Sequence, residues 1–312
     1  MASIITSLGH NVFTIDTQMG GYEGITAGYL IRSSRPALIE TGTALSAPTV
    51  IAALDELGVD ANDLATIVVT HIHLDHAGGV GTLAAAYPNA QVVVHERGAR
   101  HLVDPKKLVA SARRVFGPTM DRLFGELLPT DAARVVALGD VGSIDLGDGR
   151  SIEAFHAPGH ASHHLGMLDT ESGDLYTGDA AGIYVPETAD VRPSTPPPDF
   201  DLGLAVDSIE RMRATKPTRL LFSHFGPVLD VDTTLDRSVE ELRLWVELVR
   251  EARSNGLDLD HAVAMVQQRT AERYTAFSQD DERVAKYEEL SSTAANVSGI
   301  TRWLELNEPE QG

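Results

Sequence analysis

The 312-residue sequence contains no cysteine. This absence excludes disulfide bonds, metal sites built on thiolates and a cysteine nucleophile. A transition metal bound by this chain would therefore need histidine and carboxylate ligands.

Basic residues are also scarce, with 25 Lys and Arg against 45 Asp and Glu and a formal net charge of −20. A long phosphate backbone would meet net repulsion unless the chain carried a local basic stripe, and we see none in the sequence. Nucleic acid is therefore not expected as a partner.

Long apolar runs are missing too. No segment reaches the roughly 20 apolar residues that a membrane helix needs. Residues 1–13 lack the basic cluster and continuous apolar stretch of an export signal. We therefore expect a cytoplasmic protein without a membrane partner. With 43% hydrophobic and 22% charged residues, the composition is that of a folded globular protein.

The order of local patterns indicates a layered α/β domain followed by helices. Strand patterns occur at 11–16, 25–31, 37–40, 65–70, 91–95, repeatedly within 134–177, and at 219–223. Helical patterns occur at 47–57, 79–87, 98–128, 202–214, 233–255, 258–275 and 280–290, with a proline-rich loop at 193–198 and a frayed tail at 308–312. We interpret 98–128 as a helical insertion. The predicted division is a catalytic domain at 1–230 and a C-terminal helical region at 231–312.

A dense group of histidines follows the strand pattern at 65–70. The segment Thr-His-Ile-His-Leu-Asp-His-Ala-Gly-Gly places His71, His73, Asp75 and His76 within six positions. Alternation along an extended loop points His71 and His73 the same way, while Asp75 and His76 can turn toward a neighbouring point. Imidazole and carboxylate are the ligands that zinc and similar ions accept when thiolate is absent. Because burying so many polar groups without a shared ligand is costly, we predict that this loop binds metal.

Three further candidate ligands each follow a strand-like run: His160, Asp179 and His224. Catalytic groups gather at loops that leave strand ends, and a small residue before each candidate would let the backbone approach a metal. Alone, each is more often a hydrogen-bonded surface or capping residue. We interpret His164 as orienting a ligand and leave His163 open. The remaining histidines are interpreted as surface or packing residues without a partner at ligand spacing: His10, His95, His101, His156 and His261.

Taken in this order, the segment 71–76, Gly159-His160, Thr177-Gly178-Asp179 and Ser223-His224 resemble the metallo-β-lactamase superfamily over roughly residues 10–230. The resemblance implies a four-layer αββα sandwich with a dinuclear metal site between its two sheets. It implies a first metal on His71, His73 and His160, a second on Asp75, His76 and His224, and Asp179 as the bridge between them. Zinc is the expected metal, with iron or manganese as alternatives.

One residue departs from the family pattern. Glu40 stands where the family more often has aspartate. The resemblance makes this residue a support rather than a ligand. We therefore expect the difference to affect only the packing of one loop beside the site.

Two adjacent divalent ions would acidify a bridging water to a hydroxide that attacks a carbonyl or phosphoryl centre. Asp75 or Asp179 could then carry the proton. The segment His73 to Gly79 is similar to the glyoxalase II and lactone-hydrolase branches, which implies an ester, lactone or thioester of a small molecule as substrate. Residues 98–128 and 180–199 are expected to form the walls of the cleft. Tyr184, five positions after Asp179, is a candidate hydrogen-bond donor to the substrate.

Two rival functions stay open at this point. A phosphodiesterase of the ribonuclease Z type shares the metal motif but requires a basic surface for its substrate. A non-catalytic metal-binding protein would be signalled by missing ligands, whereas all seven positions are filled. The C-terminal helices could cover the cleft, form a homo-oligomer interface or pack against the sandwich, and we favour packing.

Overall fold

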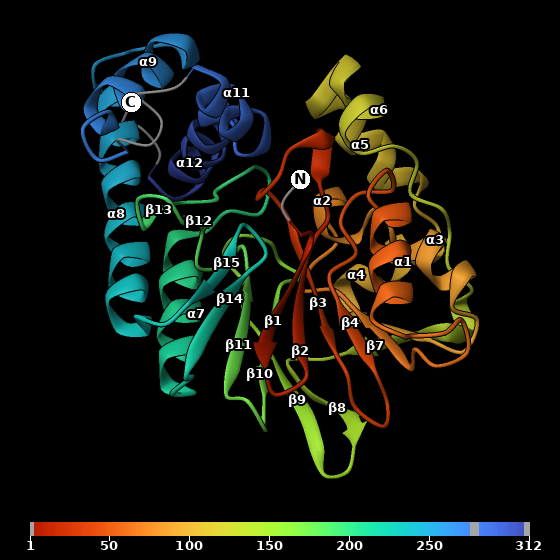
Figure 1. Ribbon diagram of the computed structural model, residues 1–312. Coiled ribbons are helices and arrows are strands. Elements are labelled where there is room, and N and C mark those ends of the chain that lie inside the picture. Colours follow the sequence, from red (N-terminus) through yellow and green to blue (C-terminus); the bar gives the residue numbers. More distant parts are fainter. Residues whose placement is uncertain (1–2, 275–280, 309–312) are drawn as a thin grey trace.

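The computed structural model describes residues 3–274 and 281–308. Two sheets pack face to face, with helices on both outer faces (Figure 1). The predicted αββα sandwich is therefore confirmed. Most strands are apolar because they are buried on both faces, which is typical of the inner layers of such a fold.

The first sheet has seven strands. In order across the sheet they are β1 (Ile5–Gly9), β2 (Val12–Asp16), β3 (Ala27–Ile31), β4 (Ala37–Ile39), β5 (Thr66–Val68), β6 (Gln91–His95) and β7 (Val135–Leu138). The strands from β1 to β4 pair antiparallel, and those from β4 to β7 pair parallel. Five of these strands correspond to the runs predicted at 11–16, 25–31, 37–40, 65–70 and 91–95, whereas β1 was not predicted.

The second sheet has six strands. In order they are β15 (Gly226–Val228), β14 (Arg219–Phe222), β11 (Asp174–Gly178), β10 (Leu165–Asp169), β9 (Arg150–His156) and β8 (Val141–Gly147). A separate two-stranded sheet joins β12 (Ile183–Val185) and β13 (Asp190–Arg192). Strand β11 pairs parallel with β14, so their carboxyl ends point toward the same edge of the sandwich.

Alternate residues of each central strand supply two different cores. Leu30 and Ile67 belong to the core under the outer helices of the first sheet, whereas Tyr29 and Val68 belong to the core between the two sheets. This follows from the two-residue period of a strand. Helices α1 (Ala47–Glu56), α3 (Val80–Ala86) and α4 (Glu96–Val103) cover the first sheet, and α7 (Leu202–Ala214) and α8 (Val231–Ser254) cover the second (Figure 1).

The segment interpreted as a helical insertion lies between β6 and β7. After α4 it contains α5 (Lys106–Phe116), the 3-10 turn η2 (Gly117–Thr119) and α6 (Met120–Leu123). Met120, Leu123 and Phe124 are buried in the core of the first sheet, but α5 has no buried residue. The segment is therefore anchored near its carboxyl end and leaves α5 at the surface.

The C-terminal helices share a core with the second sheet. Trp245 of α8 and Ile300 of α12 (Thr293–Asn307) are buried in the same cluster as Phe222 of β14, and α9 (Leu259–Thr270) adds Val266. This confirms packing against the sandwich. The prediction missed α12. Helix α11 is Asp281–Leu290, while Thr275, Asp280 and the tail residues 309–312 of the predicted segments lie outside the described residues.

No helix in the described part of the chain combines the length and apolar character required to cross a membrane.

Candidate metal centre

The predicted ligands come from loops at one end of the sandwich. The loop after β5 carries His71 and His73 and leads into the single-turn helix α2 (Leu74–Ala77). His160, Asp179 and His224 follow the carboxyl ends of β9, β11 and β14, respectively. The two sheets thus bring together residues that are far apart in sequence, as expected for loops that leave strand ends.

The first predicted ligand set is assembled. His71 Nε2 and His73 Nδ1 are 3.0 Å apart, and His160 Nε2 is 3.2 Å and 3.0 Å from these two atoms. Ligands of a tetrahedral zinc ion, at Zn–N distances of about 2.0–2.1 Å, lie roughly 3.3 Å from one another. His160 Nδ1 contacts the carbonyl oxygen of Ser194 at 3.0 Å, so its proton is held there and Nε2 is left as the metal-facing atom.

The second predicted set is assembled beside the first. Asp75 Oδ2 is 3.5 Å from His76 Nε2 and 3.4 Å from His224 Nε2, and the two histidine nitrogens are 3.1 Å apart. His224 Nδ1 is 3.0 Å from the carbonyl oxygen of Ile25. That contact fixes the proton on Nδ1 and directs Nε2 into the cluster.

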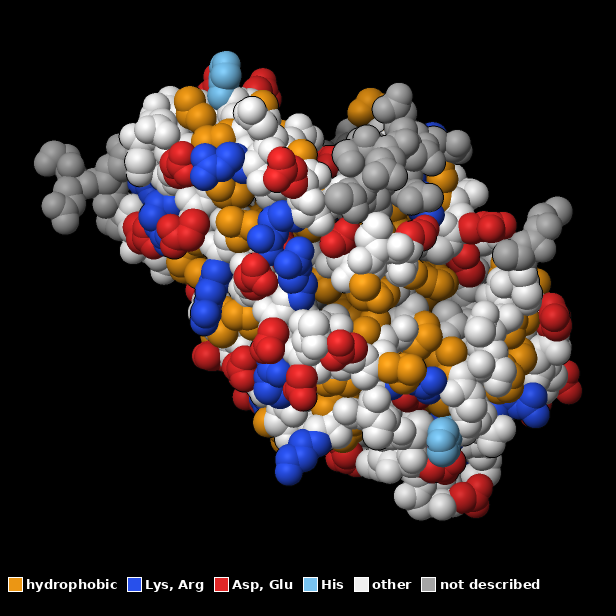
Figure 2. Space-filling view, turned by 60° about the vertical axis from the view of Figure 1, so that its left-hand side comes forward, with side chains coloured by type: hydrophobic (Ala, Val, Ile, Leu, Met, Phe, Trp, Pro, Cys, Tyr) orange, Lys and Arg blue, Asp and Glu red, His pale blue; other side chains and the backbone are white. Residues whose placement is uncertain are grey.

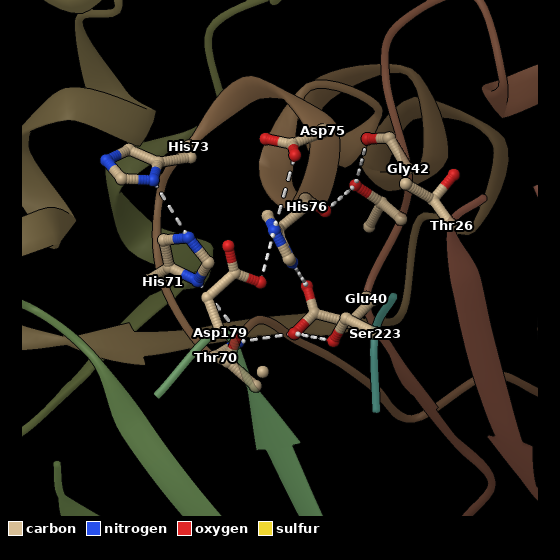
Figure 3. Close-up of polar contacts among 12 residues, drawn as sticks. Thr26, Glu40, Gly42, Thr70, His71, His73, Asp75, His76, Asp179 and Ser223 are labelled. Atoms are coloured by element: carbon tan, nitrogen blue, oxygen red, sulfur yellow. Dashed lines mark hydrogen bonds and ion pairs between the residues drawn. The ribbon is translucent and has the colours of Figure 1, made fainter. Parts of the chain in front are cut away.

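Asp179 lies between the two sets, in the position expected of a bridge. Its Oδ1 is 3.2 Å from His76 Nε2 and 3.3 Å from His224 Nε2, while its Oδ2 is 3.6 Å from His160 Nε2. Figure 3 shows this carboxylate among His71, His73, Asp75 and His76. One carboxylate oxygen is therefore available to each ligand set.

The donors fit two divalent cations. All seven side chains offer nitrogen or oxygen, and three of the four groups of metal-ligand type in the described residues are made of them, with the ligand atoms of each group within 4.8 Å of one another. Asp179 Oδ1 is buried and has no hydrogen-bond partner in residues 3–274 and 281–308. Facing imidazole nitrogens at about 3 Å repel each other unless a proton or a cation lies between them. Metal ions would satisfy both features.

The electrostatics differ between the two sets. Burial, with the neighbouring His76 and His73, holds the pKa of His71 well below its usual value, and burial with His160 lowers the pKa of His73 to about 4. Burial alone would also lower the pKa of His224, but Asp179 raises it to about 9. The first set therefore presents neutral imidazoles, whereas the second attracts positive charge, as a cation site should.

Glu40 supports the second set directly. Its Oε1 accepts a hydrogen bond from the backbone N–H of Thr70 at 3.0 Å, and its Oε2 is 3.3 Å from His76 Nδ1 (Figure 3). Glu40 is 1% exposed and has φ +64°, a left-handed conformation that non-glycine residues adopt only at a cost. The interpretation as a support agrees with these contacts. The expectation that the residue affects only loop packing is wrong, because its carboxylate touches a ligand histidine.

His164 and Gly178 position Asp179. The backbone N–H of Asp179 donates to His164 Nε2 at 3.1 Å, which confirms the interpretation of His164 as orienting a ligand. A Cβ on Gly178 would lie 2.4 Å from that same nitrogen and 2.6 Å from Thr70 Oγ1. Gly159, before His160, instead makes room for Ala205 of α7. A Cβ added to Gly159 would lie 2.3 Å from the Cα of Ala205. These glycines thus admit neighbouring side chains and a helix, rather than the metal as expected.

Two histidines outside the site do have a close partner, contrary to expectation. The rings of His95 and His156 stack with centroids 4.4 Å apart and an interplanar angle of 15°, and Asp140 Oδ1 is 3.4 Å from His156 Nδ1. Sequence reasoning missed the pair because β6 and β9 are distant in the chain. One ligand atom each of His95, Asp140 and His156 lies within 4.8 Å of the others, so the structure brings together a further group of metal-ligand type apart from the seven predicted residues.

A cavity of about 750 Å³ opens onto the cluster. His73, Asp75, His160 and Asp179 lie at its base. As predicted, residues of 98–128 and 180–199 line it, including Leu108, Val115, Phe116, Phe124 and Pro196 to Asp199. The prediction missed Ser291, Ser292, Ala295 and Asn296, which come from the undetected helix α12 and the turn before it. It also missed the basic residues of α4 and α5.

Tyr184 requires a correction. It is not among the side chains that line the cavity, and its ring stacks on Phe222 with centroids 5.6 Å apart. The expected substrate contact is therefore not supported. His163, which was left open, does line the cavity, and burial with His73 lowers its pKa to about 3.

Comparison with known proteins agrees with this geometry. The family model of the metallo-beta-lactamase superfamily matches residues 21–224. That range contains all seven ligand positions. The chain therefore belongs to the metallo-beta-lactamase superfamily.

Individual relatives are more distant. The chain is 34% identical over 165 residues to the metallo-beta-lactamase fold-containing protein ST1585 of Sulfurisphaera tokodaii, covering 52% of this chain and 60% of that protein. It is 30% identical over 144 residues to a hydroxyacylglutathione hydrolase of Synechococcus sp. strain JA-3-3Ab, covering 45% and 44%, respectively. The matches thus span about half of these curated relatives.

A longer match comes from solved structures. A beta-lactamase domain protein from Burkholderia ambifaria superposes with a TM-score of 0.66 over 99% of this chain and 91% of that one, at 17% identity. At that identity the likeness shows the fold alone. It extends the fold comparison over the C-terminal helices.

Proposed function

We propose that the protein hydrolyses a carbonyl ester, lactone or thioester of a small molecule, with two divalent metal ions, most simply zinc, held by the seven ligands. The observation that carries this proposal is the pair of ligand sets joined by Asp179 beside a cavity that is open to solvent. When bound, two such ions supply a water ionised at neutral pH and polarise the substrate oxygen. The volume of about 750 Å³ suits a small molecule.

The two carboxylates at the base would take different roles. Both oxygens of Asp179 are committed, since Oδ1 faces the second set and Oδ2 faces His160 and accepts a hydrogen bond from Ser194 Oγ at 3.1 Å. Asp75 uses only Oδ2 toward His76 and His224, and its side chain lines the cavity. Asp75 Oδ1 is therefore placed to accept the proton during attack, while Asp179 holds the two ligand sets together.

The cavity and the relatives favour carbonyl substrates. Leu108, Val115, Phe116 and Phe124 give the cavity apolar surface for an acyl chain. Among the relatives, one is named a hydroxyacylglutathione hydrolase and another, 27% identical over 161 residues, an atrochrysone carboxyl ACP thioesterase from Aspergillus chevalieri. Both names support hydrolysis at an acyl group.

The test is an assay of the zinc-loaded protein against 4-nitrophenyl butyrate, N-butyryl homoserine lactone, S-butyryl thiocholine, bis(4-nitrophenyl) phosphate and a chromogenic β-lactam. We expect turnover of one carbonyl class. Asp75→Asn should lower kcat by about 100-fold or more, the usual contribution of a positioned base. Glu153→Gln removes an exposed carboxylate bonded to Ser143, outside the site, and should leave kcat unchanged.

The rival functions correspond to other outcomes. Turnover of the phosphodiester alone would favour a phosphodiesterase of the ribonuclease Z type. A protein that holds two metals and cleaves none of the five substrates would favour a non-catalytic metal-binding role. Either result would overturn the proposal.

A further inference from the structure

One side of the cavity is basic although the chain as a whole is acidic. Four cationic side chains line it: Arg97 and Arg100 from α4, and Lys107 and Arg114 from α5. Outside the metal ligands, three carboxylates line it: Glu96, Asp199 and Glu289. Cations thus outnumber carboxylates here, whereas the full chain has 25 basic and 45 acidic residues. The expectation that the chain has no local basic cluster is therefore wrong.

Many basic residues elsewhere form ion pairs with carboxylates. Examples are the ion pairs Arg113–Asp121, Arg150–Asp169, Arg213–Asp236 and Arg219–Asp174. On the face that Figure 2 brings forward, Lys and Arg side chains are interleaved with Asp and Glu. Because Asp and Glu are in excess on the surface, a Lys or Arg side chain usually has a carboxylate nearby.

The four cavity cations have no such partner within the described ranges. Arg97 donates to the carbonyl oxygen of Ser162 at 3.3 Å, and Arg100 Nε donates to His101 Nε2 at 3.1 Å. These contacts hold each guanidinium in place but leave its charge uncompensated.

The neighbouring carboxylates are largely committed to other groups. Asp199 accepts hydrogen bonds from Ser162 N at 3.0 Å and Ser162 Oγ at 2.6 Å, and Glu289 pairs with Arg122 of α6. Of the carboxylates beside the four cations, Glu96 alone has no such contact in the described part of the chain. The basic side of the cavity therefore keeps a surplus of positive charge.

Helix α5 presents this charge next to apolar surface. Lys107 and Arg114 are seven residues apart and share one helix face, while Leu108 and Val115 share the adjoining face. A ligand in the cavity would meet a basic strip and an apolar strip side by side. A ligand that fits this pair has an apolar chain ending in an anion.

Resting on the hydrolase function proposed above, we propose that α4 and α5 bind an anionic group, a carboxylate or a phosphate, at the far end of an acyl substrate. The acyl chain then lies along Leu108 and Val115, and the scissile carbonyl lies at the metal ligands. The guanidinium forks and the Lys107 ammonium recognise either anion by charge-assisted hydrogen bonds. The cavity, about 750 Å³ in volume, has room for a small molecule of this kind.

The test measures binding of glutarate, butyrate and 3-phosphonopropionate to the zinc-loaded protein by titration calorimetry. Glutarate carries one more carboxylate than butyrate, and we expect it to bind about 10-fold more tightly. Arg114→Gln should weaken glutarate binding by about 5- to 10-fold and leave butyrate binding unchanged. Tighter binding of 3-phosphonopropionate than of glutarate would identify phosphate as the preferred anion.

The matched control is Arg113→Gln, which removes the same charge from the neighbouring position of α5. Arg113 pairs with Asp121 and does not line the cavity, so glutarate binding should stay within about twofold. Equal binding of glutarate and butyrate, or equal losses in the two variants, would overturn the proposal.

Turnover of mono-4-nitrophenyl glutarate and 4-nitrophenyl butyrate separates the two proposals. Selective glutarate binding without cleavage of either ester would refute the hydrolase function on these esters while the anion site stands. Cleavage of both esters with equal KM would refute the anion site while the hydrolase function stands.

Discussion

Replacement of Glu40 by Gln tests how the second ligand set is held. In the native protein Glu40 Oε1 accepts from Thr70 N–H at 3.0 Å, and Oε2 faces His76 Nδ1 at 3.3 Å. An amide keeps the shape but loses the negative charge that faces His76 Nδ1, and one of its two orientations also turns the NH2 group toward the buried Thr70 N–H. A buried donor left without an acceptor costs about 1–3 kcal/mol. Loss of such a support weakens metal binding by about 10- to 100-fold, or about 1.4–2.8 kcal/mol.

The assay is a competition titration of zinc against a chromophoric chelator, which gives separate dissociation constants for the two ions. We expect Glu40→Gln to weaken the binding of one ion, the one held by the second set, by about 30-fold and to leave the other within about threefold. Glu153→Gln removes an equal charge from an exposed position bonded to Ser143 and should change neither constant. A folded Glu40→Gln protein that binds both ions as tightly as the native chain would refute the role assigned to Glu40.

Three further changes probe other contacts. Gly178→Ala places a Cβ 2.4 Å from His164 Nε2 and should abolish metal binding at Asp179, as measured by elemental analysis, whereas normal metal content would show that the loop can shift freely. Burial would raise the pKa of Asp169, but Arg150 holds this pKa below its usual value of 3.8. The Arg150–Asp169 pair therefore stabilises the fold above about pH 4. Its contribution to the free energy of unfolding is lost as the pH falls. Asp169→Asn should therefore cost about 3–5 kcal/mol in urea unfolding at pH 7, with a difference that narrows toward pH 3; a constant difference would contradict the assignment. Tyr184→Phe should leave kcat/KM within about twofold, and a larger loss would place Tyr184 at the substrate after all.

The candidate metal centre was predictable because the residues proposed as its ligands lie in loops that follow strands. The density of His71, His73, Asp75 and His76 after one apolar strand needs no tertiary information. His160, Asp179 and His224 also lie where a strand pattern ends. The coincidence of several strand ends at one edge of a layered fold is what brings them together. The structure adds that the two oxygens of Asp179 face different ligand sets, Oδ1 the second and Oδ2 the first.

The supporting contacts were not predictable in the same way. Glu40, just after β4, contacts His76 in the loop region after the neighbouring strand β5, and its φ of +64° leaves no mark in the sequence. Gly178 looks like a residue that admits a metal, but the side chain it admits is His164. Such contacts depend on which loops the fold places side by side, and hydrophobic periodicity carries no information on that.

Helix α12 and the cavity show a further limit. The segment 293–307 places Val297, Ile300 and Leu304 at helical spacing, so the sequence did carry a signal for α12, whereas the approach of Gly299 to Thr195 depends on the fold. The basic residues of α4 and α5 are visible in the sequence at spacings of three and seven. Only the fold shows that Arg100 and Arg114 line the same cavity.

Metal content tests the central claim most directly. Elemental analysis of the zinc-reconstituted protein should give two equivalents per chain, because seven ligand side chains form two sets that share Asp179. Asp179→Ala should hold at most one equivalent, and Glu153→Gln, at an exposed position outside the site, should hold two. A native chain that binds one equivalent or none after reconstitution, or an Asp179→Ala variant that still binds two, would contradict the dinuclear centre.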